Sequence, residues 1–141
     1  MKKNNEKKRI IVDSNIWISS LLKPSFQTRV EVVFGTGYCL LCSEMSFREL
    51  DKAIRKPYLA KRVVRAEYDK LVSRLQIDAE LVDVHSVVEV CRDLKDNFLL
   101  ALAKDGNADY LITGDNDLLV LKEFEKTKIV MLSEFEAVFP S

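Results

Sequence analysis

The feature of this sequence that most restricts its fold is a series of short apolar runs separated by longer helical patterns. The apolar runs occur at 9–13 (RIIVD), 38–42 (YCLLC), 110–113 (YLIT) and 128–132 (KIVML), without the alternation of a half-exposed strand. Strands that are apolar on both sides are typical of parallel sheets with helices on both faces. The sequence therefore predicts an α/β fold, a three-layer α/β/α sandwich around a central, mostly parallel sheet.

Helical patterns fill the intervals between these runs. Ser14 or Asn15 can cap a first helix, in which Trp17 is expected to face the core, and Ser43 can cap another. The most apolar helix contains FLLALA and ends near Gly106. The predicted helices span 16–23, 25–34, 43–55, 59–76, 96–105, 118–124 and 133–139, and the alternating run at 80–87 (ELVDVHSV) predicts a further strand.

The 141 residues suit one domain, because a single hydrophobic core usually serves chains of roughly 100 to 200 residues. We predict one domain over residues 9–141, preceded by a flexible polar tail at 1–8.

No apolar run approaches the roughly 20 residues that cross a bilayer, and the charged start is unlike a signal segment. A cytoplasmic location without membrane contact is expected.

The cysteines favour reduced thiols over a disulfide framework, because their number, 3, is odd and no export signal is evident. Cys39 and Cys42 form a C-x-x-C motif. A spacing of three residues places them on opposite faces of a strand, so we do not expect them to share a zinc ion.

The charges balance, with 22 basic and 22 acidic residues, so the whole molecule offers no basic field that would attract nucleic acid. The two signs are nevertheless segregated along the chain. Residues 52–74 hold eight basic side chains against Glu67 and Asp69, and most aspartates lie from Asp93 onward. The basic stretch is either a pair of solvated helices or a phosphate-binding face.

Carboxylates stand directly after two of the predicted strands. Asp13 ends the first apolar run, and Asp115 follows the third run across one glycine. Asp96 opens the most apolar helix, and Glu49 lies on the helix after the second run. Ligands of open parallel sheets bind outside the carboxyl ends of the strands, so we expect these acids from four segments to converge there.

Carboxylates gathered without basic partners repel one another, and they must take up protons or bind a cation. An oxygen-only ligand set suits Mg²⁺ or Mn²⁺, whereas the single histidine, His85, offers little to zinc and fits a structural or surface position. Two such ions roughly 4 Å apart can activate water and stabilise the leaving oxygen of a phosphodiester. The predicted chemistry is hydrolytic cleavage of phosphodiester bonds.

Each of these acids also has a plain structural interpretation. Asp13 and Asp96 can serve as helix N-caps, which stabilise a helix by about 1 kcal/mol. Asp115 and Asp117 can shape a turn through bonds to nearby backbone amides. Glu49 alone would be an ordinary solvated helix residue. Only their joint placement favours a shared site.

Four segments resemble the PIN-domain family in their order and spacing. They are IIVDSNIWISSLL (10–22), SFREL (46–50), CRDLKDNFLLALA (91–103) and ADYLITGDNDLL (108–119). The resemblance covers nearly the whole chain from Arg9. It is strongest to toxin components of prokaryotic toxin–antitoxin pairs, the VapC-like ribonucleases, in which a D-x-K-D-N segment precedes the apolar helix. It implies a fold similar to flap endonucleases.

The resemblance also implies which residues form the site. The D-[ST]-N motif of the family falls on Asp13, Ser14 and Asn15, where the two polar residues steady the pocket. The helix glutamate falls on Glu49, with Glu44 as the alternative if the register differs. The other two acidic positions, with two accessory acids and a supporting hydroxyl, fall on Asp96, Asp115, Asp93, Asp117 and Thr113.

The implied activity is Mg²⁺- or Mn²⁺-dependent cleavage of single-stranded or structured RNA. Asp13, Asp96 and Asp115 would hold the metal, with Asp117 as a further ligand, and Glu49 would bind a second ion or orient the attacking water. An antitoxin that occupies the cleft and a homodimer are expected by analogy. The basic stretch would contact RNA phosphates through Arg55, Lys56, Lys61, Arg62 and Arg65.

Three other functions fit parts of the pattern. A phosphate-transfer domain of the haloacid dehalogenase type also has a strand that ends in aspartate, but it needs a second aspartate where this chain has Asn15. A receiver-like signalling domain needs an acidic pair after its first strand, which VDSN lacks. The remaining alternative is a catalytically silent PIN-like module that binds RNA or protein, and the presence of all four acids favours activity over it.

Overall fold

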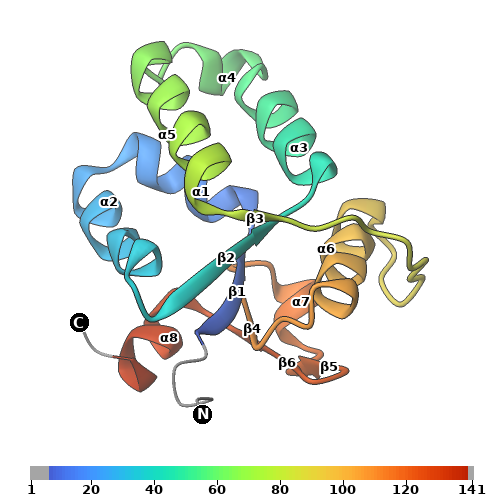
Figure 1. Ribbon diagram of the computed structural model, residues 1–141. Coiled ribbons are helices and arrows are strands. Elements are labelled where there is room, and N and C mark those ends of the chain that lie inside the picture. Colours follow the sequence, from blue (N-terminus) through green and yellow to red (C-terminus); the bar gives the residue numbers. More distant parts are fainter. Residues whose placement is uncertain (1–6, 140–141) are drawn as a thin grey trace.

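The computed structural model describes residues 7–139, which form a six-stranded sheet between layers of helices (Figure 1). The strand order is β3-β2-β1-β4-β6-β5, and every neighbouring pair is parallel except β5 with β6. The predicted α/β/α sandwich with a mostly parallel sheet is confirmed. The strands are β1 (Lys8–Val12), β2 (Tyr38–Cys42), β3 (Glu80–Leu81), β4 (Tyr110–Ile112), β5 (Glu123–Phe124) and β6 (Thr127–Val130).

Helices cover both faces of the sheet, and in residues 7–139 none combines the length and apolarity needed to cross a bilayer. The first face is packed by α1 (Ser14–Leu22), α2 (Pro24–Val30), the 3-10 turn η2 (Glu31–Phe34), α3 (Glu44–Ile54), α4 (Pro57–Ala60), α5 (Arg65–Asp78) and α8 (Leu132–Val138). The second face is packed by α6 (Leu94–Asp105) and α7 (Asn116–Leu119).

The two faces explain why the strand sequences are apolar throughout. Ile10 of β1 joins the core on the first face, and its neighbour Ile11 joins the core on the second face. Successive strand residues point to opposite sides, so a covered strand needs apolar residues at every position. Cys42 and Cys39 accordingly pack on opposite faces as free thiols, and Trp17 lies in the core with 4% of its surface exposed.

Two predicted boundaries are wrong, namely the start of the first strand and the start of the helix predicted over 59–76. β1 already begins at Lys8, whose amide donates to the carbonyl of Gly37. Residues 1–6 of the predicted tail lie outside the described residues. The helix predicted over 59–76 is interrupted at 61–64, where the β-branched Val64 is extended (φ −77°, ψ 119°) and precedes α5.

The predicted strand at 80–87 forms only the two residues of β3. The following segment, residues 82–91, lies extended along α6, and we call it the strap (Figure 1). The Asp105 carboxylate accepts hydrogen bonds from the amides of His85 (2.6 Å) and Ser86 (2.8 Å). The Asn97 side chain both donates to and accepts from the backbone of Cys91, at 2.7 Å each. These contacts hold the strap on α6 instead of on the sheet edge.

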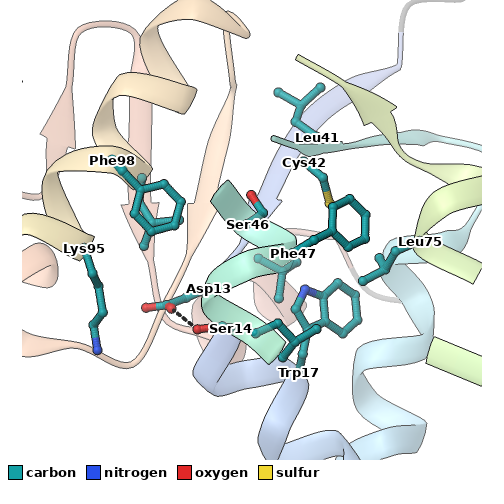
Figure 2. A pocket seen from close by; sticks show the side chains of 13 residues that line it. Asp13, Ser14, Trp17, Leu41, Cys42, Ser46, Phe47, Leu75, Lys95 and Phe98 are labelled. Atoms are coloured by element: carbon teal, nitrogen blue, oxygen red, sulfur yellow. Dashed lines mark hydrogen bonds between the residues drawn. The ribbon is translucent and has the colours of Figure 1, made fainter. Parts of the chain in front are cut away.

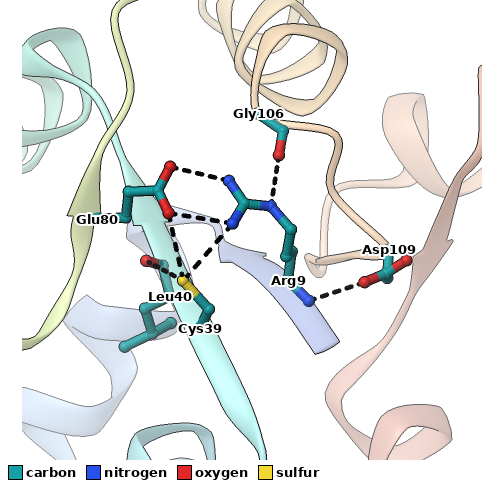
Figure 3. Close-up of polar contacts among 6 residues, drawn as sticks. All are labelled: Arg9, Cys39, Leu40, Glu80, Gly106 and Asp109. Atoms are coloured by element: carbon teal, nitrogen blue, oxygen red, sulfur yellow. Dashed lines mark hydrogen bonds and ion pairs between the residues drawn. The ribbon is translucent and has the colours of Figure 1, made fainter. Parts of the chain in front are cut away.

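Arg9, near the start of β1, connects this strand to β3 and to the end of α6 (Figure 3). Its guanidinium forms two hydrogen bonds with Glu80 of β3, at 3.0 and 2.9 Å, and its Nε donates to the carbonyl of Gly106 at 2.8 Å. Its backbone amide donates to the Asp109 carboxylate at 2.8 Å. The short edge strand and the end of α6 are thereby fixed to the central strand, which positions α6 across the sheet.

We predict that Gly106→Ala destabilises the fold, because an added Cβ would lie 2.9 Å from the Leu102 carbonyl oxygen and 2.9 Å from Leu41 Cδ1. Overpacking of this kind costs about 1–3 kcal/mol. Urea denaturation of Gly106→Ala beside Gly37→Ala measures the effect, since a Cβ at Gly37 meets no atom within 4 Å. Equal unfolding free energies for the two variants would contradict the close approach.

Candidate metal centre

The candidate site lies where the two central strands end. β1 and β4 are neighbours, and the chain leaves them toward opposite edges of the sheet, which is the position where α/β sheets bind ligands. Asp13 follows β1 and is 1% exposed. Thr113 follows β4, and its hydroxyl donates to Asp13 Oδ2 at 2.8 Å while accepting from the Asp115 amide at 3.0 Å. One buried hydroxyl thus connects the two strand ends.

Three carboxylates lie close together beside this connection. Oxygens of Asp96, Asp115 and Asp117 lie within 4.8 Å of one another. Asp96 comes from the first turn of α6, and Asp115 is the N-cap of α7, where it accepts from the Asp117 amide at 2.9 Å. The starts of α6 and α7, together with the end of β4, therefore place these three acids close to one another. Asp13 lies next to this group, not within it.

Asp96 is the most unusual of these residues. It is 0% exposed, and neither of its carboxylate oxygens has a hydrogen-bond partner among the described residues. A buried carboxylate without partners is strongly unfavourable, so it must bind a proton or a cation. Burial, followed by the facing Asp115 carboxylate, raises the pKa of Asp96 to about 7.

The pKa of Asp13 is also raised, and burial is the main cause. The hydrogen bonds from Thr113 and from the Asn15 amide act in the opposite direction, as does the positive charge of Lys95. Burial and the neighbouring acids thus disfavour negative charge at both Asp13 and Asp96 in the metal-free protein. A divalent cation would remove this penalty. The donors are all oxygens, which fits Mg²⁺ or Mn²⁺.

The remaining predicted site residues lie around this group. The Ser14 hydroxyl donates to Asp13 Oδ1 at 3.5 Å, as does the Asn15 amide at 3.5 Å. Asp93 is the N-cap of α6 and accepts from the Lys95 amide at 3.0 Å. The cap interpretation therefore holds for Asp13, and it is wrong for Asp96, because the N-cap of α6 is Asp93 and Asp96 lies in the first turn. Capping by Asp13 does not exclude a role of Asp13 in the site.

The two candidate glutamates of α3 have different surroundings. Glu44 is exposed and pairs with Arg48 at 2.5 Å, and both line a groove along the strap. Glu49 is half-buried one turn after Ser46, which lines the pocket of Asp13. No described contact joins Glu49 to the acidic group, so its role stays a prediction.

Two residues of the site were missed by sequence reasoning. Lys95 lines a small cavity of about 20 Å³ together with Asp13 and Phe98 (Figure 2). Asn97 holds the strap and so fixes the chain that leads into α6. Both belong to the CRDLKDN segment, whose polar residues at 95 and 97 were available as a signal.

Comparisons with known proteins show the family and the fold of the chain. Residues 9–117 match the family described as PIN domain. The chain is 27% identical over 130 residues to the uncharacterized protein MJ1680 of Methanocaldococcus jannaschii, which covers 84% of this chain and 77% of that protein. The crystal structure of PAE2754 from Pyrobaculum aerophilum has the same fold, with a TM-score of 0.56 and 16% identity over 94% of this chain and 88% of that chain.

We predict that the metal-free protein loses stability as the pH rises from about 4 to about 7 and that the loss levels off above this range. The folded-state pKa of Asp96 is about 7, above the roughly 3.9 of an unfolded aspartate, so between these values the folded state holds a proton that the unfolded state releases. Thermal melting in EDTA from pH 5 to 8 should show this decline. It should flatten in Asp96→Asn and persist in Asp83→Asn, which changes an exposed strap residue. Identical pH profiles for wild type and Asp96→Asn would contradict it.

We further predict that Mn²⁺ stabilises the wild-type protein at pH 8. A ligand at a hundred times its dissociation constant contributes about 2.7 kcal/mol, which is measurable as a higher melting temperature that EDTA reverses. The shift should be absent in Asp96→Asn and Asp115→Asn, because each removes a carboxylate of the group. An undiminished shift in both variants would place the cation elsewhere.

Proposed function

The chain belongs to the PIN-domain family, and on that premise we propose that it is a metal-dependent endoribonuclease that hydrolyses RNA phosphodiester bonds. The observation that carries this proposal is Asp96, whose buried oxygens face Asp115 and Asp117 and have no hydrogen-bond partner in the part of the chain that the structure describes. A group of this kind is unfavourable in a purely structural role, because apolar residues would fill the space at lower cost. Its arrangement suits a site that binds a cation.

In the proposed chemistry each of the acidic side chains, and Thr113, has a role. Asp96, Asp115 and Asp117 would hold Mg²⁺ or Mn²⁺, with Asp13 beside them. A cation bound there supplies Lewis acidity, which lowers the pKa of water and offsets charge on the phosphodiester. Thr113 keeps the Asp13 carboxylate in one orientation through its 2.8 Å hydrogen bond. Glu49 is proposed to orient the attacking water or to assist a second ion.

The proposed RNA contacts lie on both sides of α4, between the end of α3 and the start of α5. Of the five basic residues predicted to bind phosphates, Arg55 pairs with Asp51 at 2.8 Å and Arg65 pairs with Asp69 at 3.2 Å. The other three, Lys56, Lys61 and Arg62, are exposed and form no ion pair within residues 7–139. These three would position RNA without reading its sequence.

The biological role proposed is that of a toxin in a toxin–antitoxin pair. The support is the resemblance of the D-L-K-D-N segment at 93–97 to the VapC-like subgroup. An antitoxin would occupy the cleft and place a cationic side chain among the carboxylates, and the toxin would act as a homodimer. A silent PIN-like binding module is the alternative, and a catalytic assay separates the two.

We predict that the protein cleaves a labelled RNA pool with Mn²⁺ or Mg²⁺ and that EDTA stops the cleavage. Asp13→Asn, Asp96→Asn and Asp115→Asn should each lower kcat/KM on the order of 100-fold or more, because each removes charge that holds the reacting centre. Thr113→Val should lower it roughly 10–100-fold, as expected for a group that orients a ligand.

The Asp83→Asn variant is the matched control, since it removes an exposed carboxylate from the strap and should cleave as the wild type does. Folded wild-type protein that binds the RNA without cleaving it, under every metal, would support the silent module. Cleavage that survives in both Asp96→Asn and Asp115→Asn would show that the reaction takes place at another site.

A further inference from the structure

Lys95 places a positive charge beside the candidate metal centre. It lies between Asp93, the N-cap of α6, and Asp96. Its half-buried side chain lines the same pocket as Asp13 and Phe98, and the three lie next to one another in Figure 2. The backbone of this turn is fixed, because the Lys95 amide donates to Asp93 at 3.0 Å. The half-buried lysine side chain therefore starts from a fixed backbone at the rim of the site.

The ammonium group of Lys95 is not engaged by a carboxylate. Across residues 7–139 it forms no ion pair, although its positive charge acts on the carboxylate of Asp13. By contrast, Arg55, which follows α3, pairs with Asp51, and Arg65 at the start of α5 pairs with Asp69. An unpaired cation at an acidic site is available to a ligand that carries negative charge.

A phosphodiester that approaches this site brings a negative charge toward several carboxylates, which repel it. A lysine ammonium is a compact point charge that binds phosphate oxygens well. We propose that Lys95 binds a non-bridging oxygen of the RNA phosphodiester at the metal centre and positions that phosphate for hydrolysis. This inference rests on the proposed function and adds the residue that positions the reacting phosphate.

A counter-ion role is the competing explanation. In that case Lys95 would only reduce the repulsion among the aspartates. Its replacement by a neutral residue would then tighten Mn²⁺ binding or lower the stability of the metal-free protein, and it would leave the salt dependence of RNA binding unchanged. The two explanations therefore differ in a quantity that can be measured without any cleavage.

The test compares wild type, Lys95→Gln, Lys95→Arg and Lys104→Gln. Lys104 is exposed on the last turn of the same helix and serves as the matched control. Binding of a labelled single-stranded RNA pool is measured in EDTA at increasing KCl, where the slope of log K against log salt falls by about 0.7 for each phosphate that the protein no longer neutralises. The kcat/KM with Mn²⁺ and the calorimetric affinity for Mn²⁺ are measured in parallel.

We expect Lys95→Gln to lower kcat/KM roughly tenfold to hundredfold, as for the removal of a hydrogen bond to a charged group, and to reduce the salt slope by about 0.7. Lys95→Arg should keep the slope, and Lys104→Gln should match the wild type. An unchanged slope in Lys95→Gln, with RNA cleavage intact or with altered Mn²⁺ affinity, would overturn the inference. A wild-type protein that neither binds nor cleaves RNA would refute the proposed function itself, which is a distinct result.

Discussion

The repulsion between the buried carboxylate of Asp96 and the acids that it faces, beside the ends of β1 and β4, is the constraint on which the rest of the site depends. Asp96 is fully buried, has no hydrogen-bond partner within residues 7–139 and faces Asp115, and its pKa is raised to about 7, so it holds a proton below neutral pH. Removing a carboxylate from water without compensation costs several kcal/mol. A structure that accepts such a group gains when a cation takes the place of the proton.

The scaffold holds these acids together through contacts that lie outside the acidic group. Thr113 connects the end of β4 to Asp13, and Asn97 fixes the strap to the start of α6. Asp105 holds the middle of the strap, through the amides of His85 and Ser86. Since the first turn of α6 carries Asp96, the strap contributes to the position of the most buried acid. The contacts of the strap therefore help to fix the geometry of the candidate metal centre.

The sequence predicted the central strands and the acids that follow them, because burial on both faces makes a parallel strand apolar and its carboxyl end is the binding edge. It did not predict how far β3 extends. The run at 80–87 has true two-residue periodicity, but its inward valines pack on α6, and only tertiary contacts determine that choice. The spacing of the acids in the sequence also could not show that Asp117 lies within the group of Asp96 and Asp115 while Asp13 lies beside it. The positions of Asp13 and Asp117 depend on where α1 and α7 begin, and capping determines those starts.

Proton release on metal binding tests the central claim most directly. Calorimetric titration of Mn²⁺ into metal-free protein, in buffers of different ionisation enthalpy, reports the number of protons displaced. Because the pKa of Asp96 is about 7, we predict release of about one proton at pH 6 and almost none at pH 9, with the pH 6 release abolished in Asp96→Asn. Binding that releases no proton at pH 6, or the same number at both pH values, would contradict the exchange of a proton for a cation at this site.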